Sequence, residues 1–197
     1  MRTLLLVGWL LVPVAIGAWH YGPGQERMLL DDVARILAQA DRHAAEGEWA
    51  LADEKYEEAL RLLPPTRVAE GRRIRLERAK AQMLARKLPI AHQDLKGLVE
   101  EMQDDPAADP KVLAEARSAL ANSQYYMTWL MRLEGQPREV WEPEIEAARQ
   151  TYRLLAEQAE ATGDADAAKR YREDLESSIR LARMELSDLQ GLPLPSQ

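Results

Sequence analysis

The residue types that most often carry out chemistry are sparse in this sequence of 197 residues. It has no cysteine, which excludes disulfide bonds, thiolate nucleophiles and thiolate metal sites. The three histidines are far apart: His20 follows an apolar N-terminal run, His43 falls on a predicted apolar helix stripe, and His92 on a predicted helix surface. Because no His-Glu-x-x-His motif and no histidine–carboxylate spacing on one helix face occurs, we predict no metal site.

Motifs for catalysis or cofactor binding are also missing from the sequence. It contains neither a glycine-rich phosphate-binding loop nor a Gly-x-Ser-x-Gly nucleophile elbow. The paired carboxylates at 57–58, 100–101 and 104–105 are typical of solvated helix surface. The net charge of −7 argues against binding to a phosphate backbone, which needs a basic face. We therefore expect a protein that is not an enzyme, with no catalytic residue, no cofactor and no nucleic-acid partner.

The residues best suited to hold a protein partner lie in an aromatic stretch at 122–132. Asn122, Tyr126 and Trp129 are spaced at i, i+4 and i+7, which places them on one face of a helix. That face is roughly opposite the apolar stripe formed by Leu113 and Leu120. In the alternative interpretation, the aromatic side chains simply pack against the following helix. The predicted partner-binding residues are Asn122, Tyr125, Tyr126, Trp129 and Arg132.

A second candidate surface is a basic run at 67–80 within this acidic protein. Such a run could meet an acidic partner or lipid headgroups. More often it is exposed helix surface paired to nearby glutamates, here Glu70 and Glu77. The basic residues of the run are Arg67, Arg72, Arg73, Arg75, Arg78 and Lys80.

An uncharged apolar run at 4–19 follows the single basic residue Arg2. Its sixteen residues span roughly 24 Å as a helix, between the length of a signal-peptide core and that of a membrane span. Cleavage after Gly17 or Ala18 would suit a signal peptidase, whereas Trp19 and Tyr21 favour a membrane–water interface. We predict an uncleaved anchor, with a cleaved signal as the alternative. The charge on Arg2 predicts that the following chain lies outside the cytoplasm.

The sequence from residue 25 onward predicts a series of amphipathic helices. Its composition, rich in alanine, leucine, glutamate and arginine, is typical of helical proteins. Apolar residues at helical spacing, with turns at glycine and proline, predict about seven helices. Asp109 and Asp164 are predicted N-caps, and Thr66 is predicted to cap the third helix. The predicted helices are 25–46, 49–63, 66–87, 91–102, 110–134, one to 162 that begins near Pro137 or at Pro143, and 164–189.

One predicted helix pair has a specific pattern of small and large side chains. Small residues Ala52 and Ala59 flank Tyr56 at steps of four and three, and the run ends at a proline pair. This pair resembles a tetratricopeptide repeat (TPR) over about 34 residues. Other residues at matching positions are Ile36, Ala40, His43, Gly47, Trp49 and Pro64. The resemblance implies a right-handed α-solenoid whose first helices line a concave groove. It also implies that Asn122 falls where the family often has a ligand-holding asparagine.

These observations predict an all-α chain: a short TPR-like α-solenoid of about seven helices after an N-terminal hydrophobic helix. The expected segments are an anchor or signal with its turn at 1–24, the repeat domain at 25–190, and a disordered tail at 191–197. We expect a scaffold of the bacterial inner membrane, held through residues 4–19, whose soluble part binds another envelope protein or peptide outside the cytoplasm. The alternatives are a self-assembling structural homo-oligomer and a periplasmic or secreted binding protein released by cleavage.

Overall fold

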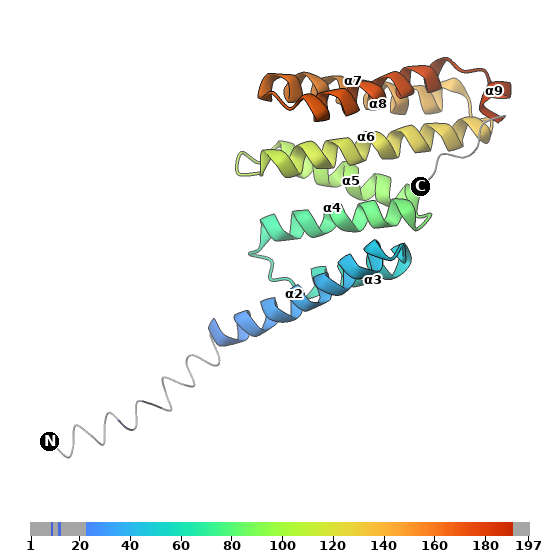
Figure 1. Cartoon of the computed structure of the whole chain (residues 1–197). Helices are drawn as coiled ribbons and strands as arrows, with labels where there is room; N and C mark the ends of the chain where they lie inside the picture. The colour runs from blue at the N-terminus through green and yellow to red at the C-terminus, as the bar shows by residue number, and fades with distance from the viewer. Residues whose placement is uncertain (1–8, 10–11, 13–22, 191–197) are drawn as a thin grey trace. The chain divides into compact units, whose positions relative to one another are not determined.

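The computed structural model describes Trp9, Val12 and residues 23–190. Residues 23–190 form helices joined by short turns, with no strand among them, which confirms the predicted all-α class. Figure 1 shows the helices in chain order. Their bounds are α2 (Pro23–Ala45), α3 (Trp49–Leu62), α4 (Val68–Leu84), α5 (Leu88–Gln103), α6 (Pro110–Leu133), α7 (Arg138–Thr162), α8 (Ala165–Arg183) and α9 (Leu186–Gln190).

The chain divides into two compact units, Met1–Arg67 and Val68–Gln197. The first unit contains the helix pair α2–α3. Gly47 adopts a left-handed φ of 76° in the turn, and the Glu48 N–H donates to the His43 carbonyl at 2.8 Å. The small and large apolar side chains alternate as predicted, and Tyr56 lies among them in the core. The buried apolar residues are Val33, Ile36 and Ala40 from α2, and Ala52, Tyr56 and Ala59 from α3.

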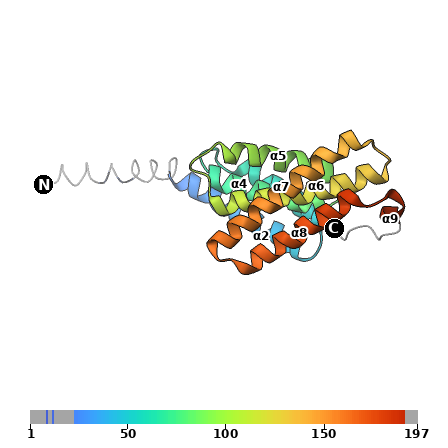
Figure 2. The same cartoon turned by 90° about the horizontal axis from the view of Figure 1, so that it is seen from above.

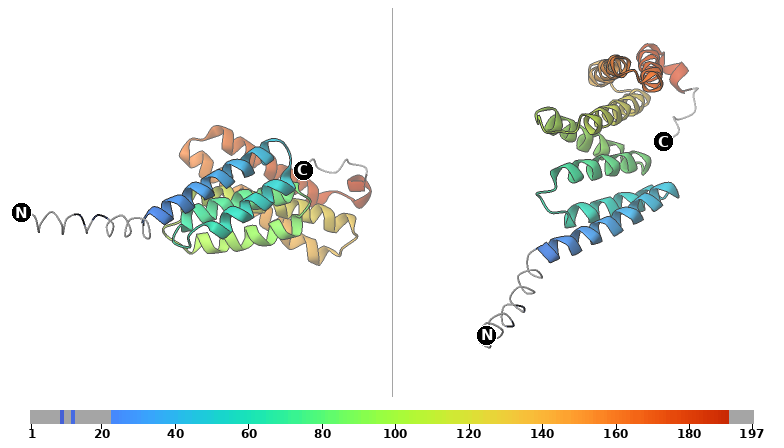
Figure 3. Two further views of the ribbon diagram at one scale, coloured as in Figure 1. Left: turned by 90° about the horizontal axis from the view of Figure 1, so that it is seen from below. Right: turned by 60° about the vertical axis from the view of Figure 1, so that its left-hand side comes forward.

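In the second unit, consecutive helices pack against one another from α4 to α8, and α4 also contacts α6. Figures 1 and 3 show that these helices run in alternating directions. The largest core cluster lies among α4, α5 and α6, because each of these helices turns its apolar stripe inward. Its buried members include Leu76, Leu95, Leu98, Met102 and Ala116.

Two helix starts in this unit differ from the prediction. Helix α4 begins at Val68 rather than at a cap on Thr66. The dipeptide Leu88-Pro89 begins α5 instead of forming the turn, because proline is compatible with the first turn of a helix and Leu88 is buried. The turn lies just before it, at Arg86, whose φ is 63°.

The caps of the later helices follow the prediction. Asp109 caps α6 by accepting the Lys111 N–H, and Asp164 caps α8 by accepting the Ala167 N–H, each at 2.9 Å. Helix α7 begins directly after Pro137 and contains Pro143, which supports the first of the two predicted starts. Helices α7 and α8 lie side by side (Figures 2 and 3).

The predicted continuous last helix is wrong: it ends at Arg183, and a short additional helix, α9, follows. Met184 is extended, with a ψ of 146°. The guanidinium of Arg132 in α6 donates hydrogen bonds to the carbonyls of Leu181 and Met184. These carbonyls have no partner within α8 once the helix ends, and Arg132 supplies the missing donor. This exit allows Leu189 of α9 to pack into a core cluster with Trp129.

The predicted membrane segment at 4–19 and the tail at 191–197 lie outside the described residues, except for Trp9 and Val12, which are exposed. Among the residues that the structure describes, no helix combines the length and the apolar character needed to span a bilayer.

Candidate functional site

A pocket of about 440 Å³ opens in the second unit between α4, the start of α5 and α6. This volume is within the range of small-ligand sites. Its apolar lining consists of Met83, Leu84, Leu88 and Ala119, with the Tyr126 ring at one side. Its polar lining consists of Lys80, Glu115, Ser118 and Asn122.

Lys80 is the one basic side chain among the described residues that line this pocket, and it pairs with two carboxylates. Its Nζ lies 2.7 Å from Glu77 Oε1 and 2.9 Å from Glu115 Oε1. Burial lowers the pKa of Lys80, but these two partners together outweigh burial and raise it above its usual value. The pocket therefore offers an apolar floor and a rim where two carboxylates accompany one ammonium group, which suits an apolar side chain better than an anion.

Three of the predicted partner-binding residues lie on accessible surface in or beside the pocket. Asn122 is exposed and lines the pocket, and Tyr126 lines it while half-buried. The half-buried Tyr125 ring contacts the Tyr126 ring edge-on, with 5.6 Å between the ring centroids. Asn122 can both donate and accept hydrogen bonds, so it could hold a peptide backbone across the pocket.

The other two predicted residues, Trp129 and Arg132, are buried and do not lie on an open surface. Trp129 is only 6% exposed and packs with Ile145, Leu181 and Leu189. Arg132 holds the end of α8, and its guanidinium carbon lies 4.8 Å from the centroid of the Trp141 ring. For Trp129 this arrangement agrees with the alternative interpretation, in which the aromatic side chain packs against the following helices, because α7 to α9 cover it.

The structure adds one acidic residue to this region that the sequence did not indicate. Asp174 of α8 lies near enough to Tyr125, Tyr126 and Tyr152 for its charge to act on all three phenols. Burial raises the pKa of the Asp174 carboxyl, although the residue as a whole is exposed. In Tyr152, burial is the first cause of a raised pKa and the charge of Asp174 the second.

No described basic side chain forms an ion pair with Asp174. Arg170 lies one turn before it on α8 and lowers its pKa, but this effect is smaller than the opposing effects of burial and of Glu173. An accessible carboxylate beside tyrosine rings can accept a basic side chain. Sequence spacing could not reveal this group, because α6, α7 and α8 each contribute to it.

The basic run at 67–80 is largely engaged within the protein. The guanidinium of Arg72 is buried, and it donates to Glu101 at 2.9 Å and to Asp105 at 2.7 Å. Arg75 also reaches Glu101, and Arg73 pairs with Asp109 at 2.9 Å. The Lys80–Glu77 pair agrees with the prediction. The structure adds more distant partners, because Glu101 lies on α5 and Asp105 and Asp109 lie between α5 and α6.

The sequence predicted His92 on an open helix surface, but the structure buries most of its side chain between α5, α6 and α7. Only 13% of the side chain is exposed. Its Nδ1 is 3.1 Å from Ser123 Oγ, and its Nε2 is 3.7 Å from Glu144 Oε2. Both ring nitrogens therefore face groups of neighbouring helices. These contacts give His92 a place in the packing of α5 against α6 and α7.

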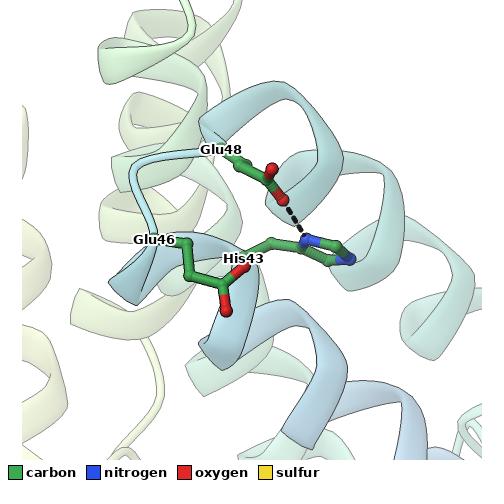
Figure 4. Close-up of side chains that lie close together, drawn as sticks. All are labelled: His43, Glu46 and Glu48. Atoms are coloured by element: carbon green, nitrogen blue, oxygen red, sulfur yellow. Dashed lines mark hydrogen bonds and ion pairs between the residues drawn. The ribbon is translucent and has the colours of Figure 1, made fainter.

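The turn of the first unit brings together His43, Glu46 and Glu48, one potential ligand atom from each lying within 4.8 Å of the others. Figure 4 shows these three side chains, with the His43 Nδ1 atom 2.6 Å from Glu48 Oε2. They belong to the end of α2, the turn, and the N-cap of α3. A search for ligands on one helix face could not find them, because the turn rather than a helix sets their spacing.

The second unit thus offers an apolar pocket with an amide and an aromatic ring at its rim, and the first offers a group of one imidazole and two carboxylates. Comparison with known proteins adds no further indication: no family model and no curated protein matches this chain.

Proposed function

We propose that this protein is a non-enzymatic adaptor that binds an extended segment of another envelope protein in the pocket between α4 and α6. The single observation that carries the proposal is that pocket: it is of ligand size, with an apolar floor and Asn122 and Tyr126 at its rim. The resemblance of the α2–α3 pair to a TPR supports the same interpretation. In a TPR-like solenoid, α4 and α6 would be first helices and would line the concave groove.

The chemistry of the pocket indicates the kind of segment that would bind. An apolar side chain would occupy the floor formed by Met83, Leu84 and Leu88. Asn122 would hold the backbone of the segment, since an amide provides both donors and an acceptor. A basic residue farther along the segment would meet Asp174, whose charge acts on the Tyr126 phenol. The net charge of −7 also favours a basic partner.

The proposed localisation is the bacterial inner membrane, with the helical part outside the cytoplasm. The apolar run at 4–19 after Arg2 supports it. In a Gram-negative host, the full chain should fractionate with the inner membrane and be degraded by protease only after the periplasm is opened. A shortened soluble form that begins near Trp19 would show instead that the segment is a cleaved signal.

Capture of partners from detergent-solubilised membranes tests the function. Asn122→Trp would fill the pocket rim from an exposed position, so it should abolish the capture of any specific partner while preserving the helical circular dichroism signal. Leu154→Trp is a matched control, because Leu154 is exposed on α7 and does not line the pocket. Equal capture by both variants would refute binding at the pocket.

The rival proposal is a self-assembling oligomer of the envelope, in which the partner is a second copy of this chain. Light scattering over a range of protein concentrations separates the two. A monomer at all concentrations supports the adaptor. An oligomer that Asn122→Trp dissociates, while Leu154→Trp does not, would instead identify the pocket as a self-association site.

A further inference from the structure

The turn between α2 and α3 holds three side chains that are common metal ligands. The imidazole of His43 and the carboxylates of Glu46 and Glu48 each place one ligand atom within 4.8 Å of the other two. The closest pair, His43 Nδ1 and Glu48 Oε2, is 2.6 Å apart (Figure 4). Two carboxylates beside one imidazole form a donor set of the mixed nitrogen and oxygen type that transition metals take.

The backbone of the turn fixes the spacing of these three groups. The Gly47 N–H donates to the Ala44 carbonyl at 3.1 Å, and the Glu48 N–H donates to the His43 carbonyl at 2.8 Å. Gly47 has a φ of 76°, a left-handed conformation that glycine adopts at low cost. His43 and Glu48 are thus joined through the backbone as well as through their side chains, so the turn holds the two side chains next to each other before any cation arrives.

The side chain of Glu48 is oriented toward this group rather than toward its own helix. Glu48 is the N-cap of α3, a position where a polar side chain often accepts a free N–H of the first turn. Its side chain makes no such capping bond, and its carboxylate contacts His43 instead. Within the described residues, Glu46 forms no ion pair, so its carboxylate is available to a cation.

We propose that His43, Glu46 and Glu48 form a site for a divalent transition cation, with zinc as its natural occupant. Zinc binds imidazole nitrogen and carboxylate oxygen at about 2.0–2.2 Å, which places two tetrahedral ligands roughly 3.3 Å apart. The 2.6 Å hydrogen bond between His43 and Glu48 must therefore break and its two atoms separate, while the Glu46 carboxylate moves toward them. The exposed carboxyl groups of Glu46 and Glu48 can rotate to do this. Magnesium and calcium prefer oxygen ligands alone and fit this group poorly.

A cation bound in this position would link the end of α2 to the start of α3 through its coordination bonds. Because all three ligands lie within the turn, binding favours the folded pair over the unfolded chain, in which the ligands are not held together. Three protein ligands leave at least one coordination position for water or for a group of a partner. This inference is independent of the proposed function, because the pocket lies in the other unit.

The test is isothermal titration of the untagged full-length protein with zinc chloride, together with the absorption spectrum after cobalt(II) addition. We expect one zinc per chain, and cobalt bands in the visible range that indicate coordination by nitrogen and oxygen. His43→Ala, Glu46→Gln and Glu48→Gln should each weaken zinc binding by more than about tenfold, the size of effect seen when a metal site is disturbed. Glu54→Gln is the control, because Glu54 is an exposed carboxylate on α3 outside the group.

Three outcomes would overturn the proposal. The first is the absence of zinc binding to a protein that is folded by circular dichroism. The second is binding that survives both His43→Ala and the exposed change Glu46→Gln, which would place the cation elsewhere, for example at His20. The third is equal competition by magnesium, which would indicate general attraction to acidic surface rather than a site with an imidazole ligand.

Discussion

The hydroxyl of Tyr56 donates a 2.7 Å hydrogen bond to the Asp41 carboxylate and so joins α3 to α2. The Tyr56 ring is buried with only 4% exposure, between the fully buried Ala52 and Ala59. Asp41 lies on the exposed part of α2, so the side chain crosses the helix interface from core to surface. The ring therefore fills the core while the hydroxyl reaches a charged acceptor at its edge.

The first prediction separates these two contributions of Tyr56. Tyr56→Phe keeps the ring and should lower the free energy of unfolding by about 1.5–3 kcal/mol, the usual range for a hydrogen bond to a charged group. Tyr56→Ala should lower it by about 3–5 kcal/mol, because it also empties a large aromatic site. Urea denaturation followed by circular dichroism measures both. Equal effects of the two substitutions would show that ring packing does not stabilise the pair.

The second prediction concerns the division of the aromatic stretch between core and surface. Trp129→Ala should lower the free energy of unfolding by about 3–5 kcal/mol, because it empties a buried site beside Leu181 and Leu189. Asn122→Ala should change it by no more than about 0.5 kcal/mol, as expected for an exposed side chain. Thermal melts compare the two. A small effect of Trp129→Ala on the free energy of unfolding would contradict the burial of Trp129 and would support its place on the binding surface.

The third prediction follows from the raised pKa of Asp174, whose first cause is burial. The folded protein holds the proton more tightly than the unfolded chain, whose carboxyl titrates near the ordinary value of 3.8. Protonated Asp174 therefore stabilises the folded state at pH values below the unfolded pKa. This stabilisation is lost as the pH rises through the higher pKa of the folded protein. Asp174→Asn should therefore raise the melting temperature at pH 7 relative to the parent, and the difference should shrink toward pH 3. Glu176→Gln, an exposed change on the same helix, is the control.

The fourth prediction concerns the contacts of Arg72 and has the opposite pH dependence. The backbone N–H of Ala107 and then Arg72 lower the pKa of Asp105, while Arg75 and then Arg72 lower that of Glu101. Stability from these ion pairs is present above the unfolded carboxyl pKa values and is lost as the pH falls through the lower folded values. Arg72→Met should thus lower the melting temperature at pH 7 and have a smaller effect near pH 2. A loss that is equal at both pH values would assign Arg72 a packing role only.

Local sequence signals predicted most of the helices. The caps at Asp109 and Asp164, the turn at Gly47 and the apolar spacing around Tyr56 all act within a few residues, and the structure has them where they were expected. The end of α8 at Arg183 was not predictable in this way. It depends on Arg132, which is 49 residues before the carbonyl of Leu181 to which it donates.

The same limit explains what the sequence missed at the candidate sites. Trp129 and Asn122 share a helix face by spacing, yet later helices cover Trp129 and leave Asn122 exposed. The charge of Asp174 reaches tyrosines of α6 and α7 only because α8 returns beside them. Helical periodicity gives the direction of a side chain, whereas its neighbours depend on contacts between distant parts of the chain.

The most direct test of the adaptor proposal is site-specific photo-crosslinking in living cells. A photoreactive amino acid is placed at Asn122, which lines the pocket, or at Leu154, which is exposed on α7 away from it. The proposal predicts a discrete adduct with one other envelope protein from position 122 and none from position 154. The absence of any adduct from position 122, or the same adducts from both positions, would contradict it.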